Sequence, residues 1–272
     1  MARFASPEDE WRSYLAGTHP STLLGRRTFR RIPSSPRCKV CYAPFGAPGG
    51  PVFRRLGFAP WDKNPNMCMH CISELAEHEV IGADVEISYL FADVRGSSDL
   101  ARSMQTLEFA RLMQRFYTTA SRVLLERDAI LDKFVGDEVV GFFLPLLTGP
   151  NHAGAALRAA RELLSATGHG AESGPWLPLG ASVNTGVAFV GMVSREGGSE
   201  FTSFGDPINI AAHLAARAAP GEILLTEAAA TAAGLPTADL QRRRLSLKGH
   251  DVTAAVLMAS ISMSSAERSA SG

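Results

Sequence analysis

The pattern of apolar and polar positions divides the chain into two unlike parts. From about residue 84 onward, apolar runs typical of strands take turns with stretches of helical periodicity. The segment 86–92 is predicted to be a strand, and 103–126 a helix. Two further strands, 130–135 and 139–144, are joined by Gly136 and Asp137, a pair that favours a two-residue hairpin turn.

The alternation continues towards the carboxyl end. Helices are predicted over 152–167 and 206–218, and strands around 177–185, 187–193, 223–226, 240–247 and 252–258. Strands interleaved with helices and joined by hairpins are typical of an α+β fold with a ferredoxin-like βαββαβ core. We expect one such domain over residues 84–260, followed by a disordered, Ser- and Ala-rich tail over 261–272.

The first 35 residues are predicted to form an amino-terminal arm. A short acidic helix is expected over 7–16, followed by a basic stretch that contains Arg26, Arg27, Arg30 and Arg31. So few arginines favour an arm that is solvated or lies on a partner subunit over one that binds a membrane or nucleic acid.

Residues 36–82 form a second predicted unit, rich in Gly and Pro and with too little apolar surface to fold alone. The four cysteines of the chain all lie here in two Cys-x-x-Cys pairs, Cys38 with Cys41 and Cys68 with Cys71. Four thiolates at this spacing can close a tetrahedron around a structural Zn²⁺, which would supply folding energy. An iron–sulfur cluster is the alternative metal group, and His70, inside the second pair, is expected to be a bystander.

Composition narrows the functional classes. Lys plus Arg and Asp plus Glu each total 27, so the chain as a whole has no positive field to hold nucleic acid or an anionic membrane. The apolar runs are far too short to cross a hydrocarbon core of roughly 30 Å, and the acidic amino terminus is unlike a signal peptide. We therefore expect a cytoplasmic protein with no nucleic-acid partner and no membrane insertion.

Two aspartates stand where strands end. Asp93 follows the first strand and precedes a glycine turn at Gly96, and Asp137 lies at the tip of the predicted hairpin. Two carboxylates on adjacent strands can hold paired magnesium ions, while the N–H groups of the turn face phosphate. Taken singly, each aspartate could equally be a helix cap or a turn residue, and Arg95 reads as a packing or interface residue.

Five segments extend this signal in chain order: FADVRG, KFVGDEVVGFF, NTGVAFVG, FTSFGDPINIAAHLAARAAPGEILLT and LSLKG. In order and spacing they resemble the catalytic domain of the class III adenylyl and guanylyl cyclases. The resemblance implies a palm-type domain that closes a nucleoside triphosphate into a cyclic monophosphate. It also implies a head-to-tail homodimer with two equivalent sites, because the family's sites lie between two catalytic domains.

The resemblance also assigns roles to residues. Asp93 and Asp137, with the backbone of Val94, match the ligands of two Mg²⁺ or Mn²⁺ ions on one protomer. The matching residues of the other protomer are Lys133 and Thr202, which would read the base, Asn209, which would orient the ribose, and Lys248, which would bind the triphosphate. Gly96 would face the phosphates. The implied reaction is attack of the ribose 3′-hydroxyl on the α-phosphorus with loss of pyrophosphate.

The base-reading pair favours ATP over GTP. Adenine offers an acceptor at N1 and a donor at its amine, which suit an ammonium donor at Lys133 and a hydroxyl acceptor at Thr202. Guanine reverses both polarities and would leave Lys133 facing a donor. The pair also resembles a bacterial adenylyl cyclase variant in which threonine takes the place of aspartate. A guanylyl cyclase remains the alternative.

One position departs from the family pattern. Four residues after Asn209, where the family has an arginine that stabilises the transition state, this chain has His213. Losing one preorganised donor of this kind costs on the order of 10² to 10³ in rate, unless Arg217 reaches the phosphates instead. The prediction is therefore an adenylyl cyclase that could be slow. The alternatives are a weakly catalytic nucleotide-binding regulator and, against the zero net charge, a nucleic-acid-binding zinc ribbon.

Overall fold

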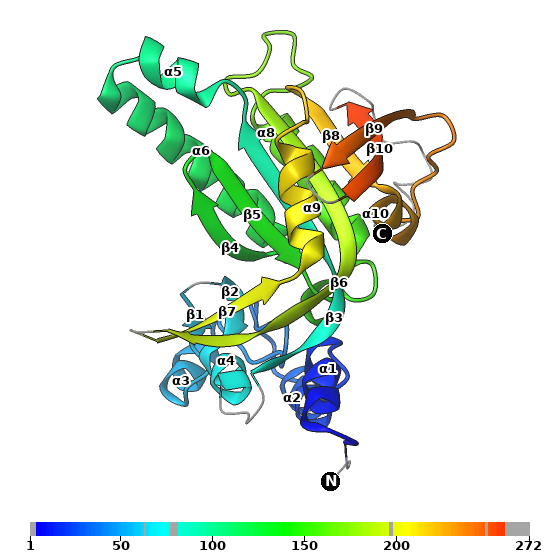
Figure 1. Cartoon of the computed structure of the whole chain (residues 1–272). Coiled ribbons are helices and arrows are strands. Elements are labelled where there is room, and N and C mark those ends of the chain that lie inside the picture. Colours follow the sequence, from blue (N-terminus) through cyan, green and yellow to red (C-terminus); the bar gives the residue numbers. More distant parts are fainter. Residues whose placement is uncertain (1–3, 63, 77–80, 196–197, 248–249, 259–272) are drawn as a thin grey trace.

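The computed structural model describes residues 4–62, 64–76, 81–195, 198–247 and 250–258 (Figure 1). The described residues contain one large sheet and a small two-stranded one. The strands are β1 (Pro60–Trp61), β2 (Asn64–Cys68), β3 (Gly82–Val94), β4 (Ile130–Val135), β5 (Glu138–Phe143), β6 (Leu179–Arg195), β7 (Gly198–Phe204), β8 (Glu222–Thr226), β9 (Gln241–Leu247) and β10 (His250–Met258).

The helices are mostly short, and the two long ones are α6 and α8. They are α1 (Pro7–Leu15), α2 (Pro20–Phe29), α3 (Gly50–Arg55), α4 (Met69–Ala76), α5 (Ser97–Ser103), α6 (Thr106–Glu126), α7 (Pro145–Thr148), α8 (His152–Ala166), α9 (Asp206–Ala215) and α10 (Glu227–Ala232). None of the described helices is long and apolar enough to cross a lipid bilayer.

The large sheet has the strand order β4-β5-β3-β6-β8-β10-β9, and β7 also pairs with β6. The long strand β3 lies in its interior, antiparallel to β5 on one side and to β6 on the other. The pairing of β6 with β8 is parallel, and the other pairings are antiparallel. This mixed sheet with helices on its faces confirms the predicted α+β class.

Each face of the sheet carries its own hydrophobic core. On one face, buried residues of α6 and α8 pack against β3, β5 and β6. Phe116 and Leu163 are among the residues with no exposed surface. α6 is amphipathic, and its first turn is fixed by a capping box between Gln105 and Glu108. The other face is covered by α9 and by the amino-terminal segments, which share a second core.

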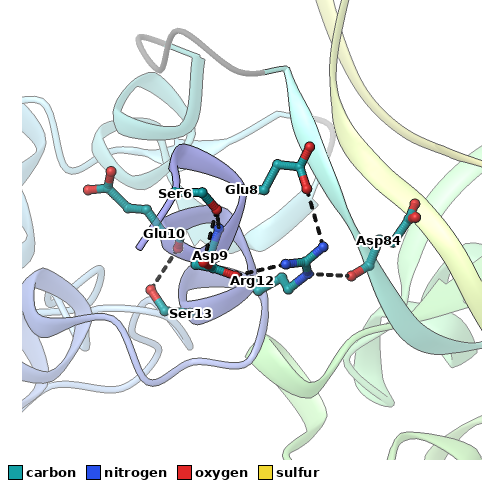
Figure 2. Close-up of polar contacts among 7 residues, drawn as sticks. All are labelled: Ser6, Glu8, Asp9, Glu10, Arg12, Ser13 and Asp84. Carbon is teal, nitrogen blue, oxygen red and sulfur yellow. Dashed lines mark hydrogen bonds and ion pairs between the residues drawn. The ribbon is translucent and has the colours of Figure 1, made fainter. Parts of the chain in front are cut away.

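The amino-terminal arm is folded onto the sheet, so the expectation of a solvated or partner-bound arm is wrong. Trp11 is 0% exposed, and Tyr14 and Leu15 are also buried in the second core. Figure 2 shows how the arm is tied to the domain: Arg12 Nε donates to the Asp84 carbonyl of β3 at 3.3 Å. The spacing of Trp11, Tyr14 and Leu15 places three apolar side chains on one face of α1, which explains the docking.

The cysteine-containing segment, which we call the cysteine module (residues 36–76), sits against the turn between α6 and β4. Asn66 Nδ2 donates to the Leu125 carbonyl at 2.7 Å, and the buried Asn64 Nδ2 donates to the Ala129 carbonyl at 3.0 Å. Lys39 pairs with Asp128 at 3.2 Å. Figure 1 shows α1 to α4 gathered at one end of the sheet, near the start of β3.

Several predicted boundaries move in the structure. The helix expected over 103–126 begins at Thr106, after the separate short helix α5, and the two strands expected around 177–185 and 187–193 are one continuous strand, β6. The helix expected over 206–218 ends at Ala215. The strand β7 and the helices α2, α3, α4 and α10 were not predicted. The predicted tail over 261–272 lies outside the described residues.

Candidate active site

The structure brings the two predicted metal-binding aspartates to one edge of the sheet. Asp93 lies one residue before the end of β3, and Asp137 lies in the turn between β4 and β5. The Val94 N–H donates to the Asp137 carbonyl at 3.1 Å, which fixes the hairpin tip against the end of β3. The pairing of β3 with β5 brings Asp93 near Asp137, because Asp93 lies opposite Glu138, the residue that follows Asp137.

Glu138 is a third carboxylate at this edge, and the sequence analysis did not single it out. Its Oε1 atom is buried and has no hydrogen-bond partner among the described residues. Burial, followed by the charge of Asp137, raises the pKa of Glu138. A concentration of hard oxygen donors with an unsatisfied, partly desolvated member fits a divalent cation such as Mg²⁺ or Mn²⁺.

Arg95 closes the carboxylate group from one side. Its guanidinium forms an ion pair with Asp93, and its Nη1 donates to the Ala216 carbonyl, just after α9, at 3.0 Å. Burial lowers the pKa of Arg95, while the charges of Asp137 and Glu138 act in the opposite direction. Arg95 is therefore a cation of the site itself, rather than only the packing or interface residue expected from the sequence.

The glycine turn follows directly. Gly96 has a φ of 70°, in the left-handed region that favours glycine, and it caps the short helix α5. The ideal Cβ of another residue would meet no atom within 4 Å, so the backbone conformation rather than crowding calls for glycine here. The Gly96 carbonyl accepts hydrogen bonds from the N–H groups of Asp99 and Leu100 at 3.0 Å each.

A second group of polar residues joins β4 to β7. Thr202 Oγ1 donates to Asp132 Oδ1 at 2.9 Å, and Lys133 Nζ lies 3.3 Å from Asp132 Oδ2. The predicted base-reading residues Lys133 and Thr202 thus share one carboxylate, although they are far apart in the sequence. Tyr89 is a buried neighbour of this group, and burial, with the charge of Asp132 adding to it, raises the pKa of Tyr89 to about 12.

The remaining predicted residues lie on or beyond α9. Asn209 and His213 are both exposed, one helical turn apart on α9. Arg217 is also exposed, but it follows the end of the helix, so it does not continue that face as the longer predicted helix implied. Lys248, the predicted triphosphate-binding lysine, lies outside the described residues.

The four cysteines meet as predicted in one buried cluster. Their sulfurs all lie within 4.8 Å of one another, with Cys41 Sγ to Cys68 Sγ at 3.7 Å and Cys68 Sγ to Cys71 Sγ at 3.5 Å. A zinc ion bonded to four sulfurs at about 2.3 Å requires sulfur separations of about 3.8 Å, so the donor set fits. His70 is exposed, lies against the Phe58 ring in a tilted arrangement with ring centroids 4.7 Å apart, and is not part of the cluster.

The electrostatics of the cluster also favour a cation. Hydrogen bonds from Cys41, Cys68 and Cys71 lower the pKa of Cys38. Hydrogen bonding with Cys38 in turn raises the pKa of Cys68 and Cys71. The buried cluster therefore accepts one thiolate readily and resists further negative charge, which a divalent cation would stabilise.

Sequence comparison identifies one matching family. The family model described as "Adenylate and Guanylate cyclase catalytic domain" matches residues 81–262. Among curated proteins, the uncharacterized proteins Rv1318c and Rv1320c of Mycobacterium tuberculosis are 27% and 28% identical over 178 residues. Each match covers 62% of this chain, and it covers 32% and 30% of the two relatives. The chain thus spans about a third of the length of the curated relatives it matches.

Solved structures share the fold. The crystal structure of the guanylyl cyclase Cya2 aligns with a TM-score of 0.57 and 22% identity, covering 65% of this chain and 94% of that one. The adenylyl cyclase CyaB from P. aeruginosa aligns with a TM-score of 0.56 and 22% identity, covering 65% and 96%. Because these two neighbours carry different activities in their names, the similarity of fold alone does not choose between the two nucleotides.

Proposed function

Because the chain belongs to the family of adenylate and guanylate cyclase catalytic domains, we propose that it is an adenylyl cyclase, which converts ATP to 3′,5′-cyclic AMP and pyrophosphate. Family membership implies a nucleotidyl cyclase, a phosphorus–oxygen lyase, and the choice of ATP is our own step. The observation that carries this step is the grouping of Lys133 and Thr202 on one buried carboxylate, which leaves an ammonium donor beside a hydroxyl. This pair complements the adenine edge.

The carboxylate edge is the proposed catalytic centre. Asp93 and Asp137, with the Val94 carbonyl, would hold two Mg²⁺ or Mn²⁺ ions, and the unsatisfied oxygen of Glu138 beside them supports an oxygen-rich cation site. Such ions, when bound, polarise the phosphate oxygens and lower the pKa of the attacking hydroxyl. Arg95 would leave Asp93 for the incoming phosphate, since a guanidinium pairs with either anion.

The other residues would orient the substrate. Asn209 on α9 would hold the ribose, Lys248 and the N–H groups at Gly96 the triphosphate, and Lys133 with Thr202 the base. The ribose 3′-oxygen would then bond to the α-phosphorus as the bond to the pyrophosphate oxygen breaks, and the hydroxyl proton would pass to solvent. His213, in the place of the family's arginine, supports slow turnover.

We further propose a homodimer with two shared sites. The exposed positions of Asn209 and His213 support this arrangement, because side chains that must reach a substrate face solvent on the isolated chain. In the dimer, one protomer would supply Asp93 and Asp137, and its partner would supply the base-reading and ribose-binding residues. The same proposal places the chain in the cytoplasm, where ATP is abundant and free thiolates persist.

The cysteine module is proposed to bind one structural Zn²⁺ through Cys38, Cys41, Cys68 and Cys71. The closed, fully buried sulfur set supports a structural site, because a catalytic zinc keeps one position open. The second candidate function, a weakly catalytic nucleotide-binding regulator, is favoured by His213 and by the Arg95–Asp93 ion pair, which occupies a proposed metal ligand.

One assay separates these functions. Purified protein is incubated with Mg²⁺ or Mn²⁺ and either ATP or GTP, and cyclic product and pyrophosphate are quantified by chromatography. The proposal expects equal amounts of cyclic AMP and pyrophosphate from ATP, at a rate well above that with GTP. A dominant cyclic GMP product would make the protein a guanylyl cyclase. Nucleotide binding without either product would establish the regulatory function instead.

A further inference from the structure

Asp132 occupies an irregular position in β4. The pairing register between β4 and β5 shifts between Leu131 and Lys133, so Asp132 is the extra residue of a β-bulge. In a regular strand, neighbouring side chains point to opposite faces of the sheet. The bulge removes this restriction, and the side chains of Asp132 and Lys133 meet, with Lys133 Nζ 3.3 Å from Asp132 Oδ2.

The Asp132 side chain is buried although it is an acid. It is only 4% exposed, whereas Lys133 remains 54% exposed and can reach a ligand. A buried carboxylate is costly unless it is hydrogen-bonded or paired with a cation. Thr202 Oγ1 donates to Asp132 Oδ1 at 2.9 Å, and Asp132 Oδ2, which forms no hydrogen bond among the described residues, faces the Lys133 ammonium at 3.3 Å as an ion pair. One carboxylate therefore holds both residues that we propose to read the base.

The contact with Thr202 decides what its hydroxyl can offer to a base. A threonine hydroxyl has one proton to donate and two lone pairs to accept, so an unrestrained hydroxyl would suit the adenine amine or guanine O6 equally well. An ionised carboxylate only accepts. With its proton committed to Asp132, Thr202 presents lone pairs alone, and a lone pair fits the adenine amine but repels guanine O6.

We propose that Asp132 is a positioning residue that sets the nucleotide preference, by holding the Thr202 hydroxyl as an acceptor and Lys133 as a donor. This inference rests on the proposed function, because it concerns the same nucleotide site. It goes beyond that proposal because the preference would depend on three residues, of which Asp132 does not touch the base.

The substitution Asp132→Asn tests the inference with little change of shape. The ammonium of Lys133 would attract the amide oxygen, because hydrogen bonds to charged groups are the stronger ones. The amide nitrogen would then donate to Thr202, and the hydroxyl proton would become free to donate to a base. The preference for adenine over guanine should fall by up to about tenfold, because Thr202 could then form one neutral hydrogen bond to guanine O6.

Equilibrium binding keeps this test separate from catalysis. Dissociation constants of 3′-deoxy-ATP and 3′-deoxy-GTP, which lack the attacking hydroxyl, are measured by calorimetry for the full chain and its variants in Mg²⁺. The wild type should prefer the adenine analogue, and Asp132→Asn should lose most of that preference. Asp132→Ala, which frees the hydroxyl to rotate, carries the same expectation if the asparagine variant does not fold. The proposed cyclase activity is judged separately, by product formation from ATP.

Two further measurements separate positioning from general damage. Ser203→Ala removes the neighbouring buried hydroxyl, which lies beside Tyr89 and forms no hydrogen bond with Asp132, and should leave the preference unchanged. In a Thr202→Val background, Asp132→Asn should have little further effect on the preference, because the two act through one hydroxyl. Equal weakening of both analogues by Asp132→Asn, an unchanged preference, or a wild type with no preference would each overturn the inference.

Discussion

A mixing experiment tests whether the active sites are shared between two protomers. Asp137→Ala removes a proposed metal ligand, and Lys133→Ala removes a proposed base reader. Each homodimer should lose activity by a factor of about 10² or more, because every site then lacks one preorganised charged group. The two residues lie four positions apart in one hairpin, yet in a head-to-tail dimer they would serve different sites.

The expected recovery follows from counting sites. When the two variants are mixed in equal amounts and exchange freely, about half of the dimers are mixed, as for any symmetric pairing. In a mixed dimer, one site carries both defects and the other carries neither. Activity should therefore return to about a quarter of the wild-type value. Initial rates of cyclic AMP formation measure this in the mixture, and mixed dimers isolated through two different affinity tags should reach about half of the wild-type rate.

A matched control should give inactive mixed dimers if the sites are shared. A double variant, Asp137→Ala with Lys133→Ala, is paired with the wild-type chain, and both sites of this mixed dimer then carry one defect. Isolated mixed dimers of this kind should be nearly inactive. Inactive mixed dimers of the single variants, together with half-active mixed dimers of wild type and double variant, would show that each site is built within one chain and would refute the shared arrangement.

Three further predictions concern metal, rate and pH. Elemental analysis should give about one zinc per chain. Cys71→Ser should lose that zinc and unfold at a lower temperature, because metal binding contributes folding energy. Stoichiometric iron with visible absorption would contradict a zinc site. His213→Arg should raise turnover about tenfold or more, because a guanidinium restores the charged donor that the family has at this position. An unchanged or slower variant would contradict the assigned role. Burial lowers the pKa of His169, and its Nε2 accepts a backbone N–H at 2.9 Å. The neutral His169 side chain therefore contributes its full stability above the unfolded pKa of about 6.5. This stability is lost as the pH falls from there towards the lower pKa of the folded state. Urea unfolding between pH 7.5 and 5 should therefore show a smaller loss of stability for His169→Gln than for the wild type, and equal losses would refute this assignment.

The hydrophobic pattern predicted the elements that bury one clear face. β4, β5 and α8 lie within one or two residues of their predicted ranges, because their apolar positions alternate or recur at helical spacing. The docking of α1 was missed although its signal was present, since Trp11, Tyr14 and Leu15 have the spacing of a buried helical face. Glycine and proline in the same region suggested an unstructured arm more strongly than this short helix suggested a buried one.

The rest of the site depends on pairing between strands, which a single sequence does not reveal. Glu138 follows Asp137 in the sequence, but its place beside Asp93 comes from the pairing of β3 with β5. Asp132 meets Thr202 only because a bulge breaks the register of β4 and because β7, which was not predicted, lies beside it. The individual metal and base-reading residues could be proposed from motifs, but their second contacts follow from tertiary structure.

The seating of the cysteine module has a thermodynamic consequence. The module is hydrogen-bonded to the last residue but one of α6 and to Ala129, immediately before β4, the strand that carries Asp132 and Lys133. A metal at the cysteines and a nucleotide at the base site would thus both bind to parts of the chain that contact the segment from the end of α6 to β4. If the metal tightens nucleotide binding by some factor, the nucleotide must tighten metal binding by the same factor. Saturation with nucleotide would then raise the chelator concentration needed to remove the zinc at equilibrium, so zinc affinity would report how tightly the nucleotide is bound.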